Sequence, residues 1–180
     1  KASKWTVMAY VKTFDDITGH WAASDIRLMA SRQIVKGVSD ELFAPGDPVT
    51  RAQFTALLQR ALGLEEEEPA EATFTDVQPG TWYYGSVETA YRAGLVKGVG
   101  DGTFRPNARI TRQEMAAMIV RAMEFDGRAP SIPAAQIDAV LGNFSDAAKI
   151  SGWAREAAAA AVETGIISGR PGPTFAPKAE

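Results

Sequence analysis

Two short motifs place a hydroxyl, a guanidinium and an amide or carboxylate at the predicted start of a helix. The segment 50–53 reads Thr-Arg-Ala-Gln, and the segment 111–114 reads Thr-Arg-Gln-Glu. A threonine followed three residues later by Gln or Glu predicts a capping box, in which each side chain bonds the other residue's backbone N–H. The arginine then takes the first helical position, where the helix dipole disfavours a cation. A free helix N-terminus beside a guanidinium suits an anion, above all a carboxylate.

Arg51 and Arg112 are therefore the first candidate ligand contacts. The alternative explanation of both residues is a structural salt bridge. If they bind a ligand, we expect replacement of both by alanine to abolish binding and to leave the fold intact.

Three other residue types recur at fixed positions and are further binding candidates. A tryptophan stands at the head of each predicted first helix, where it packs in the core, forms a helix staple or offers a platform for a sugar ring. A glycine in the following loop either supplies a positive φ or lets a ligand approach the backbone. An aspartate three residues later can hydrogen-bond sugar hydroxyls. The candidates of these types are Trp21, Trp82, Trp153, Gly37, Gly98, Asp40 and Asp101.

These candidates recur because the chain contains three near-copies of one pattern. Each copy has Phe-x-Asp, then Trp, then Val or Ile two residues before Gly, then Phe-x-Pro. The glycine and the phenylalanine are six positions apart in every copy, at 37 and 43, 98 and 104, and 169 and 175. The Thr-Arg pair follows the phenylalanine by seven positions in the first two copies, which puts a third pair at position 182. We expect the third motif to have been lost by truncation or cleavage.

The repeats divide the sequence into six parts. They are an N-terminal extension (1–13), repeat 1 (14–63), an acidic linker (64–73), repeat 2 (74–125), a second linker (126–143) and an incomplete repeat 3 (144–180). We interpret the glutamates of the acidic linker as a solvated connector, and expect a short helix at 134–141 in the second. A less favoured role for the extension is to fill the place of the third motif. Its segment 5–11 could form a strand, a helical turn or a tail.

Each repeat is predicted to fold as helix, loop, helix, which makes the chain all-α. The first helix begins near the tryptophan and runs for about a dozen residues, and the second begins at the Thr-Arg motif. Gly94 and Gly165 stand where a helix end favours a left-handed residue, whereas repeat 1 has Gln33 there. The aspartates of Phe-x-Asp are expected to be caps or turn formers before the first helix, at Asp16, Asp76 and Asp146.

Composition excludes several classes of function. The net charge is −3 and no apolar run could span a membrane, so neither nucleic acid nor membrane insertion is indicated. There is no cysteine and one histidine, His20, and no nucleophile-elbow or EF-hand motif occurs. We expect no catalytic residue, no metal site and no cofactor.

Taken in order, the motifs resemble S-layer homology modules. The resemblance lies in Phe-x-Asp, His-Trp-Ala at 20–22, Val-x-Gly, Asp-Gly-Thr-Phe-x-Pro at 101–106 and Thr-Arg-x-Glu at 111–114. It covers nearly everything from Phe14 to Glu180. The resemblance implies a pseudo-threefold, three-pronged helical domain of three modules.

The resemblance also implies a function. Such modules are non-catalytic anchors that attach S-layer proteins and secreted enzymes to the bacterial cell wall, outside the cell. The implied partner is the secondary cell wall polymer, often carrying pyruvylated N-acetylmannosamine, bound in grooves between neighbouring repeats. Other S-layer or cell-surface domains are further candidate partners. The alternative is a helical protein–protein interaction or assembly module that ignores sugar.

The resemblance identifies the whole four-residue motif as a binding hallmark, which adds Gln53 and Glu114 to the candidate ligand-binding residues. Gln53 stands where the family usually has Glu. We therefore expect the first groove to keep its cap and to change its sugar contacts.

Overall fold

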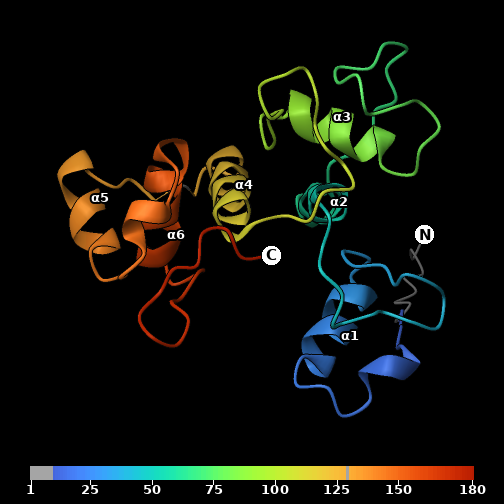
Figure 1. Ribbon diagram of the computed structural model, residues 1–180. Coiled ribbons are helices and arrows are strands. Elements are labelled where there is room, and N and C mark those ends of the chain that lie inside the picture. Colours follow the sequence, from blue (N-terminus) through green and yellow to red (C-terminus); the bar gives the residue numbers. More distant parts are fainter. Residues whose placement is uncertain (1–9, 129) are drawn as a thin grey trace, which may run out of the picture. The chain divides into compact units, whose positions relative to one another are not determined.

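The computed structural model describes residues 10–128 and 130–180, and this part of the chain is helical (Figure 1). No strand occurs in these ranges, so the prediction of an all-α fold is confirmed, while the pseudo-threefold arrangement stays a prediction. Most of the segment 5–11 lies outside the described residues. The α-helices are α1 (Ala23–Ser31), α2 (Arg51–Ala61), α3 (Tyr84–Arg92), α4 (Arg112–Phe125), α5 (Ala134–Leu141) and α6 (Arg155–Glu163). Three short 3-10 helices are η1 (Asp15–Ile17), η2 (Ala147–Lys149) and η3 (Gly152–Ala154).

The predicted helix starts are largely correct. The helices α2 and α4 begin at the arginine of each Thr-Arg motif, and α5 covers the segment predicted from the second linker. The first helices of the repeats, α1, α3 and α6, are nine residues long rather than a dozen. They begin two residues after the tryptophan, which itself belongs to the preceding turn or 3-10 helix. No helix of the described ranges is both long and apolar enough to cross a membrane.

The chain forms two compact units, with the boundary between Asp47 and Pro48. This boundary falls inside the first sequence repeat, so α2 belongs to the unit that holds repeats 2 and 3. Within that second unit, α2 packs on α3, α4 packs on α6, and α5 packs on the other side of α6 (Figure 1). Each Thr-Arg helix therefore packs on the first helix of the following repeat.

The acidic linker is held against α3. Its glutamates are exposed, as expected of a solvated segment, but its backbone is fixed at several points. The Glu67 N–H donates to the Thr89 hydroxyl at 2.7 Å, and the Tyr84 hydroxyl donates to the Pro69 carbonyl at 2.6 Å. This segment thus covers one face of α3 and helps to bury it.

The three Phe-x-Asp aspartates bind a distant loop, so their interpretation as helix caps is wrong. In repeat 2, the two oxygens of Asp76 accept hydrogen bonds from the backbone N–H groups of Phe104 and Arg105, at 2.8 and 2.7 Å. Repeats 1 and 3 have the same arrangement at Asp16 and Asp146. The residue after the phenylalanine has a positive φ in all three loops, between 54° and 61°. The carboxylate thus stabilises a left-handed turn occupied by a residue other than glycine.

The recurring loop glycines are required by packing. Gly37, Gly98 and Gly169 have no positive φ, so that interpretation of them is wrong. A Cβ at Gly98 would lie 2.7 Å from the Phe74 ring and 2.8 Å from the Thr103 carbonyl oxygen. The phenylalanine of Phe-x-Asp occupies the same place beside the other two glycines. The predicted left-handed helix ends are present, with φ of 76° at Gly94 and 70° at Gly165.

We expect Gly98→Ala to destabilise the second unit by about 2 kcal/mol, because the new methyl group overpacks the Phe74 ring. The measurement is the free energy of unfolding by denaturant titration. Gly152→Ala is the matched control, since nothing lies within 4 Å of its added Cβ. Equal stability of the two variants would contradict the packing explanation.

The Asp16 carboxyl makes the stability of the first unit depend on pH. Hydrogen bonds from the backbone N–H groups of Phe43 and Ala44 hold the pKa of Asp16 below its ordinary value of 3.8. Its stabilising effect is therefore complete above the unfolded-state pKa and is lost as the pH falls through the lower folded-state pKa. We expect amide-exchange protection in α1 to fall on acidification through this range, after correction for intrinsic rates. Asp16→Asn should flatten this dependence, and an unchanged profile in that variant would refute the assignment.

Candidate functional site

Arg51 is fixed by three partners within the second unit. Its Nε donates to the Phe104 carbonyl at 2.9 Å, one terminal nitrogen donates to the Lys97 carbonyl at 3.3 Å, and the other pairs with Glu114 at 2.9 Å. The guanidinium lies 4.8 Å from the centre of the Phe104 ring. Burial lowers the pKa of Arg51, and the charge of Glu114 opposes that effect. The salt-bridge alternative thus describes the contacts that Arg51 makes in this structure.

Arg112 repeats this arrangement one module later. Its guanidinium donates to the Phe175 and Ser168 carbonyls, both at 2.9 Å, and lies 5.6 Å from the centre of the Phe175 ring. Within the described residues no carboxylate pairs with Arg112. The two arginines therefore have the hydrogen bonds to loop carbonyls in common, and the ion pair is found at Arg51. Each arginine ties the start of its helix to the Val/Ile-x-Gly and Phe-x-Pro segments of the next repeat.

The N-termini of α2 and α4 are occupied by protein groups. In α2, the Arg51 and Ala52 N–H groups donate to the Ala108 and Pro106 carbonyls at 2.9 and 3.0 Å. The first two N–H groups of α4 donate in the same way to the Ala179 and Pro177 carbonyls. The prediction of a free helix N-terminus that receives an anion is therefore wrong.

The capping boxes are present at both motifs. The Thr50 hydroxyl accepts from the Gln53 N–H at 3.2 Å, and the Gln53 amide oxygen accepts from the Thr50 N–H at 2.8 Å. At the second motif, the Glu114 carboxylate accepts from the N–H and the hydroxyl of Thr111 at 2.8 and 2.7 Å. Glu114 uses its other oxygen for Arg51, so one carboxylate serves both the cap and the ion pair.

A pocket of about 550 Å³ opens beside this ion pair. Its wall comes from α2, the loop of repeat 2, α4 and both ends of repeat 3. Five of the side chains that line it are basic, and Glu114 is the one carboxylate among them. The lining residues are Arg51, Lys97, Gly98, Val99, Gly100, Arg105, Gln113, Glu114, Ala117, Met118, Arg121, Ser151, Trp153 and Lys178.

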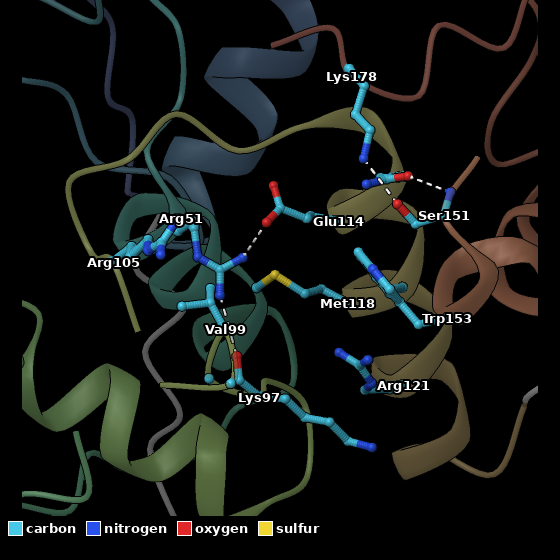
Figure 2. Close-up of a pocket in the computed structure, with 14 residues that line it drawn as sticks. Arg51, Lys97, Val99, Arg105, Glu114, Met118, Arg121, Ser151, Trp153 and Lys178 are labelled. Carbon is cyan, nitrogen blue, oxygen red and sulfur yellow. Dashed lines mark hydrogen bonds and ion pairs between the residues drawn. The ribbon is translucent and has the colours of Figure 1, made fainter. Parts of the chain in front are cut away.

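Figure 2 shows how the principal groups lie around this space. Arg51 turns toward Glu114 and the Lys97 carbonyl, and Arg121 and Trp153 stand across the pocket from it. Trp153 is 58% exposed, which leaves its ring open to a ligand. Burial lowers the pKa of Arg121, and within the described chain this guanidinium has no hydrogen bond or ion pair. The pocket thus offers an open aromatic ring beside an uncommitted cation.

The structure brings only part of the predicted site together. Arg51, Gly98, Glu114 and Trp153 line the pocket, and the other candidates of the second unit, Arg112, Gln53, Trp82 and Asp101, do not. Trp21, Gly37 and Asp40 belong to the first unit. Trp21 and Trp82 are 87% and 59% exposed, so core packing explains none of the three tryptophans.

The two aspartates predicted to meet sugar hydroxyls have different surroundings. The Asp101 carboxylate accepts from the N–H and the hydroxyl of Thr103, and pairs with Arg105 at 3.3 Å. The Thr103 hydrogen bonds lower the pKa of Asp101. Asp40 is fully exposed and lies 3.9 Å from Lys12. The Asp101 carboxylate therefore stabilises its own loop.

Sequence reasoning missed the basic side chains Lys97, Arg105, Arg121 and Lys178. A signal existed for Arg121, because Glu114, Ala117, Met118 and Arg121 follow helical spacing along one face of α4. Lys97 directly precedes a glycine that was already a candidate. Lys178 has no such signal, since only the fold brings it to the Ser151 hydroxyl, at 2.9 Å.

We expect the Arg51–Glu114 pair to contribute strongly to stability, which changes the expectation for the arginine-to-alanine variants. Removal of Arg51 leaves a partly buried carboxylate and two carbonyls without their donor, so loss of binding in that variant would reflect loss of the fold. In a double-mutant cycle with alanine, we expect a coupling energy of about 2 kcal/mol. The exposed Arg92–Glu67 pair, at 3.4 Å, is the matched control and should give less than about 1 kcal/mol. A coupling no larger than that of the control would contradict this role of Arg51.

Comparison with known proteins identifies the family. The profile of the S-layer homology domain matches residues 13–55, 73–116 and 143–180, which is more than half of the chain. The chain is 42% identical over 176 residues to an amylopullulanase of Thermoanaerobacterium thermosulfurigenes, covering 98% of this chain and 9% of that protein. It is 42% identical to the exoglucanase XynX of Acetivibrio thermocellus, covering 92% and 15%, and 34% identical to the S-layer protein sap of Bacillus anthracis, covering 91% and 19%.

The chain thus spans less than a fifth of each of these three relatives, and enzymes and an S-layer protein share the same segment. The segment that they share contains the three tandem repeats that the family profile matches, and it is not a catalytic domain. The chain belongs to the S-layer homology domain family and is an extracellular cell-wall anchoring module rather than an enzyme.

Proposed function

We propose that the pocket of the second unit binds an acidic sugar of the secondary cell wall polymer, with pyruvylated N-acetylmannosamine as the preferred residue. Binding of this sugar attaches the protein that carries the module to the cell wall. The observation that carries the proposal is the charge of the pocket wall, which has five basic side chains and one carboxylate in a chain of net charge −3.

The cations of the pocket differ in what they can offer a ligand. Arg51 is bound to protein on three sides, and Arg105 pairs with Asp101. Arg121 and the Lys97 ammonium have no hydrogen bond or ion pair among the described residues. We assign the carboxylate of the pyruvate ketal to Arg121 and Lys97, because a guanidinium binds a carboxylate through two parallel hydrogen bonds. Arg51 then contributes its charge and the position of the loop.

The sugar ring is assigned to Trp153. A large aromatic ring that is more than half exposed at the wall of a pocket is typical of a ligand platform. Gly100 carries no side chain, and nothing lies within 4 Å of an added Cβ there, so the ligand can approach the loop backbone at this part of the wall. The aromatic ring and the cation together suit a sugar that carries a negative charge.

The relatives agree with this role. S-layer proteins are among them, in Bacillus anthracis and Bacillus thuringiensis, and enzymes that act on polysaccharides carry the same segment. A module shared by such different proteins is best explained by a common attachment partner. We therefore extend the cell-wall attachment of the family to this chain, with the second-unit pocket as its binding site.

We expect Trp153→Ala and Arg121→Ala each to weaken binding of a pyruvylated N-acetylmannosamine saccharide by about tenfold or more, the equivalent of one lost charge-assisted hydrogen bond or stacking contact. The measurement is isothermal titration calorimetry on the whole chain. Both side chains are partly exposed and should be removable without loss of the fold, which circular dichroism checks.

Arg92→Ala, which removes an exposed cation outside the pocket, is the control and should bind normally. The same saccharide without the pyruvate ketal should bind more weakly to the wild type but equally to the wild type and Arg121→Ala. Normal binding by both pocket variants would refute the site. No saccharide binding, together with tight binding to another surface protein, would favour the protein-interaction alternative.

A further inference from the structure

The turn that carries Trp153 is short and lies on α4. Trp153 is the middle residue of η3, whose first hydrogen bond runs from the Ala154 N–H to the Ser151 carbonyl at 2.8 Å. A 3-10 helix of one turn is weakly held by its own hydrogen bonds. Ile150 and Ala154 are buried on either side of this turn, in the core cluster that includes Ala116 of α4. The position of the Trp153 ring therefore depends on how the turn is fixed to α4.

Gln113, the second residue of α4, makes a polar contact with this turn. It is 3% exposed, and its amide oxygen accepts from the Ser151 N–H at 3.1 Å. The C-terminal segment holds both partners, since the Gln113 N–H donates to the Pro177 carbonyl at 3.1 Å and the Lys178 ammonium donates to the Ser151 hydroxyl at 2.9 Å (Figure 2). Burial of a long amide side chain costs rotamer entropy and desolvation. The contact that offsets this cost here lies two residues before Trp153.

Repeat 2 lacks this contact. The residue of the first motif that corresponds to Gln113 is Ala52, which has no polar side chain. The residue that corresponds to Ser151 is Gly80, and the φ angles of the two differ, at −61° for Ser151 and 82° for Gly80. Trp82 packs edge-on against the ring of the next residue at 5.3 Å and does not line the pocket. The contact with the start of a Thr-Arg helix thus occurs at the tryptophan that lines the pocket.

Trp153 has no aromatic neighbour that orients its ring. The next residue is Ala154, and among the described residues no other ring packs on Trp153. A ring that is ordered before the ligand arrives binds more tightly, because its ordering does not oppose binding. The Gln113 contact can provide this order, since it fixes the backbone of Ser151 at the start of the same turn.

We propose that Gln113 is a positioning residue of the pocket, which fixes the turn of η3 and thereby holds the Trp153 ring in place as a platform. This inference rests on the proposed binding of an acidic sugar, in which the sugar ring lies on Trp153. The effect of Gln113 on binding passes through Trp153. The second motif then serves the pocket twice, through the ion pair of Glu114 with Arg51 and through the hydrogen bond of Gln113 with the following repeat.

The first test is made without ligand, by ¹⁵N relaxation of the Trp153 side-chain N–H. Gln113→Met and the smaller Gln113→Ala both remove the amide oxygen, whereas Gln113→Glu keeps an oxygen that accepts from the Ser151 N–H. We expect the Trp153 order parameter to fall toward about 0.6, the value of a flexible group, in the first two variants. It should stay at the wild-type value in Gln113→Glu.

Two controls accompany this measurement. The Trp82 side-chain N–H reports in the same spectra that the second unit is folded. Gln136→Met, at an exposed position of α5 outside the pocket, should leave the Trp153 order parameter unchanged. A wild-type order parameter in Gln113→Met and Gln113→Ala would overturn the proposal, as would equal loss of order in Gln113→Glu.

The second test is a double-mutant cycle on binding of the pyruvylated N-acetylmannosamine saccharide, measured by calorimetry on the whole chain. Gln113→Met should weaken binding by about fivefold, the equivalent of one hydrogen bond. In the Trp153→Ala background the same change should alter binding by less than about twofold, because the ring that it orders is already gone. Equal losses in the two backgrounds would contradict a role through Trp153. Failure of the wild type to bind the saccharide would refute the proposed function, and the order parameter of Trp153 would still decide the role of Gln113.

Discussion

The structure depends on the contact between the first turn of one helix and a loop of the next repeat. The start of a helix presents N–H groups without partners, and an irregular loop presents carbonyls without partners. Here the two sets satisfy each other, because the Arg51 N–H donates to the Ala108 carbonyl and the Arg112 N–H donates to the Ala179 carbonyl. The two arginine side chains add hydrogen bonds to the Phe104 and Phe175 carbonyls. Arginine is suited to this position because its planar group donates in several directions and stacks on the phenylalanine ring below it. The unfavourable placement of a cation at a helix start is thereby offset.

This contact explains why the sequence repeat and the compact unit do not coincide. A Thr-Arg helix belongs by sequence to one repeat and by packing to the next, so α2 joins the second unit. The pocket forms where two such helix–loop contacts lie side by side, since Arg51 belongs to the start of α2 and Glu114 to the start of α4. A chain that is slightly acidic overall can hold an anion there, because the loop and α4 bring basic side chains together locally.

Local features could be predicted from the sequence, and long-range contacts could not. The capping boxes of Thr50 and Thr111 and the left-handed ends at Gly94 and Gly165 depend on residues within one turn, so their spacing was sufficient. The partner of Asp76 lies 28 residues away, and a helix cap was the local alternative. The binding roles of Arg51, Gly98 and Trp153 were inferred from type and recurrence, which do not separate a structural arginine from a free one. Arg121 escaped notice because it lies outside the recurring motifs.

A crystal structure of the chain with a pyruvylated N-acetylmannosamine saccharide tests the central claim most directly, namely that Arg51 builds the site while other groups bind the ligand. We predict the ring on Trp153 and the ketal carboxylate at Arg121 and Lys97, with Arg51 still bonded to the Phe104 and Lys97 carbonyls. A ligand bound outside this pocket, or an Arg51 side chain that leaves its carbonyls to bind the carboxylate, would contradict the account.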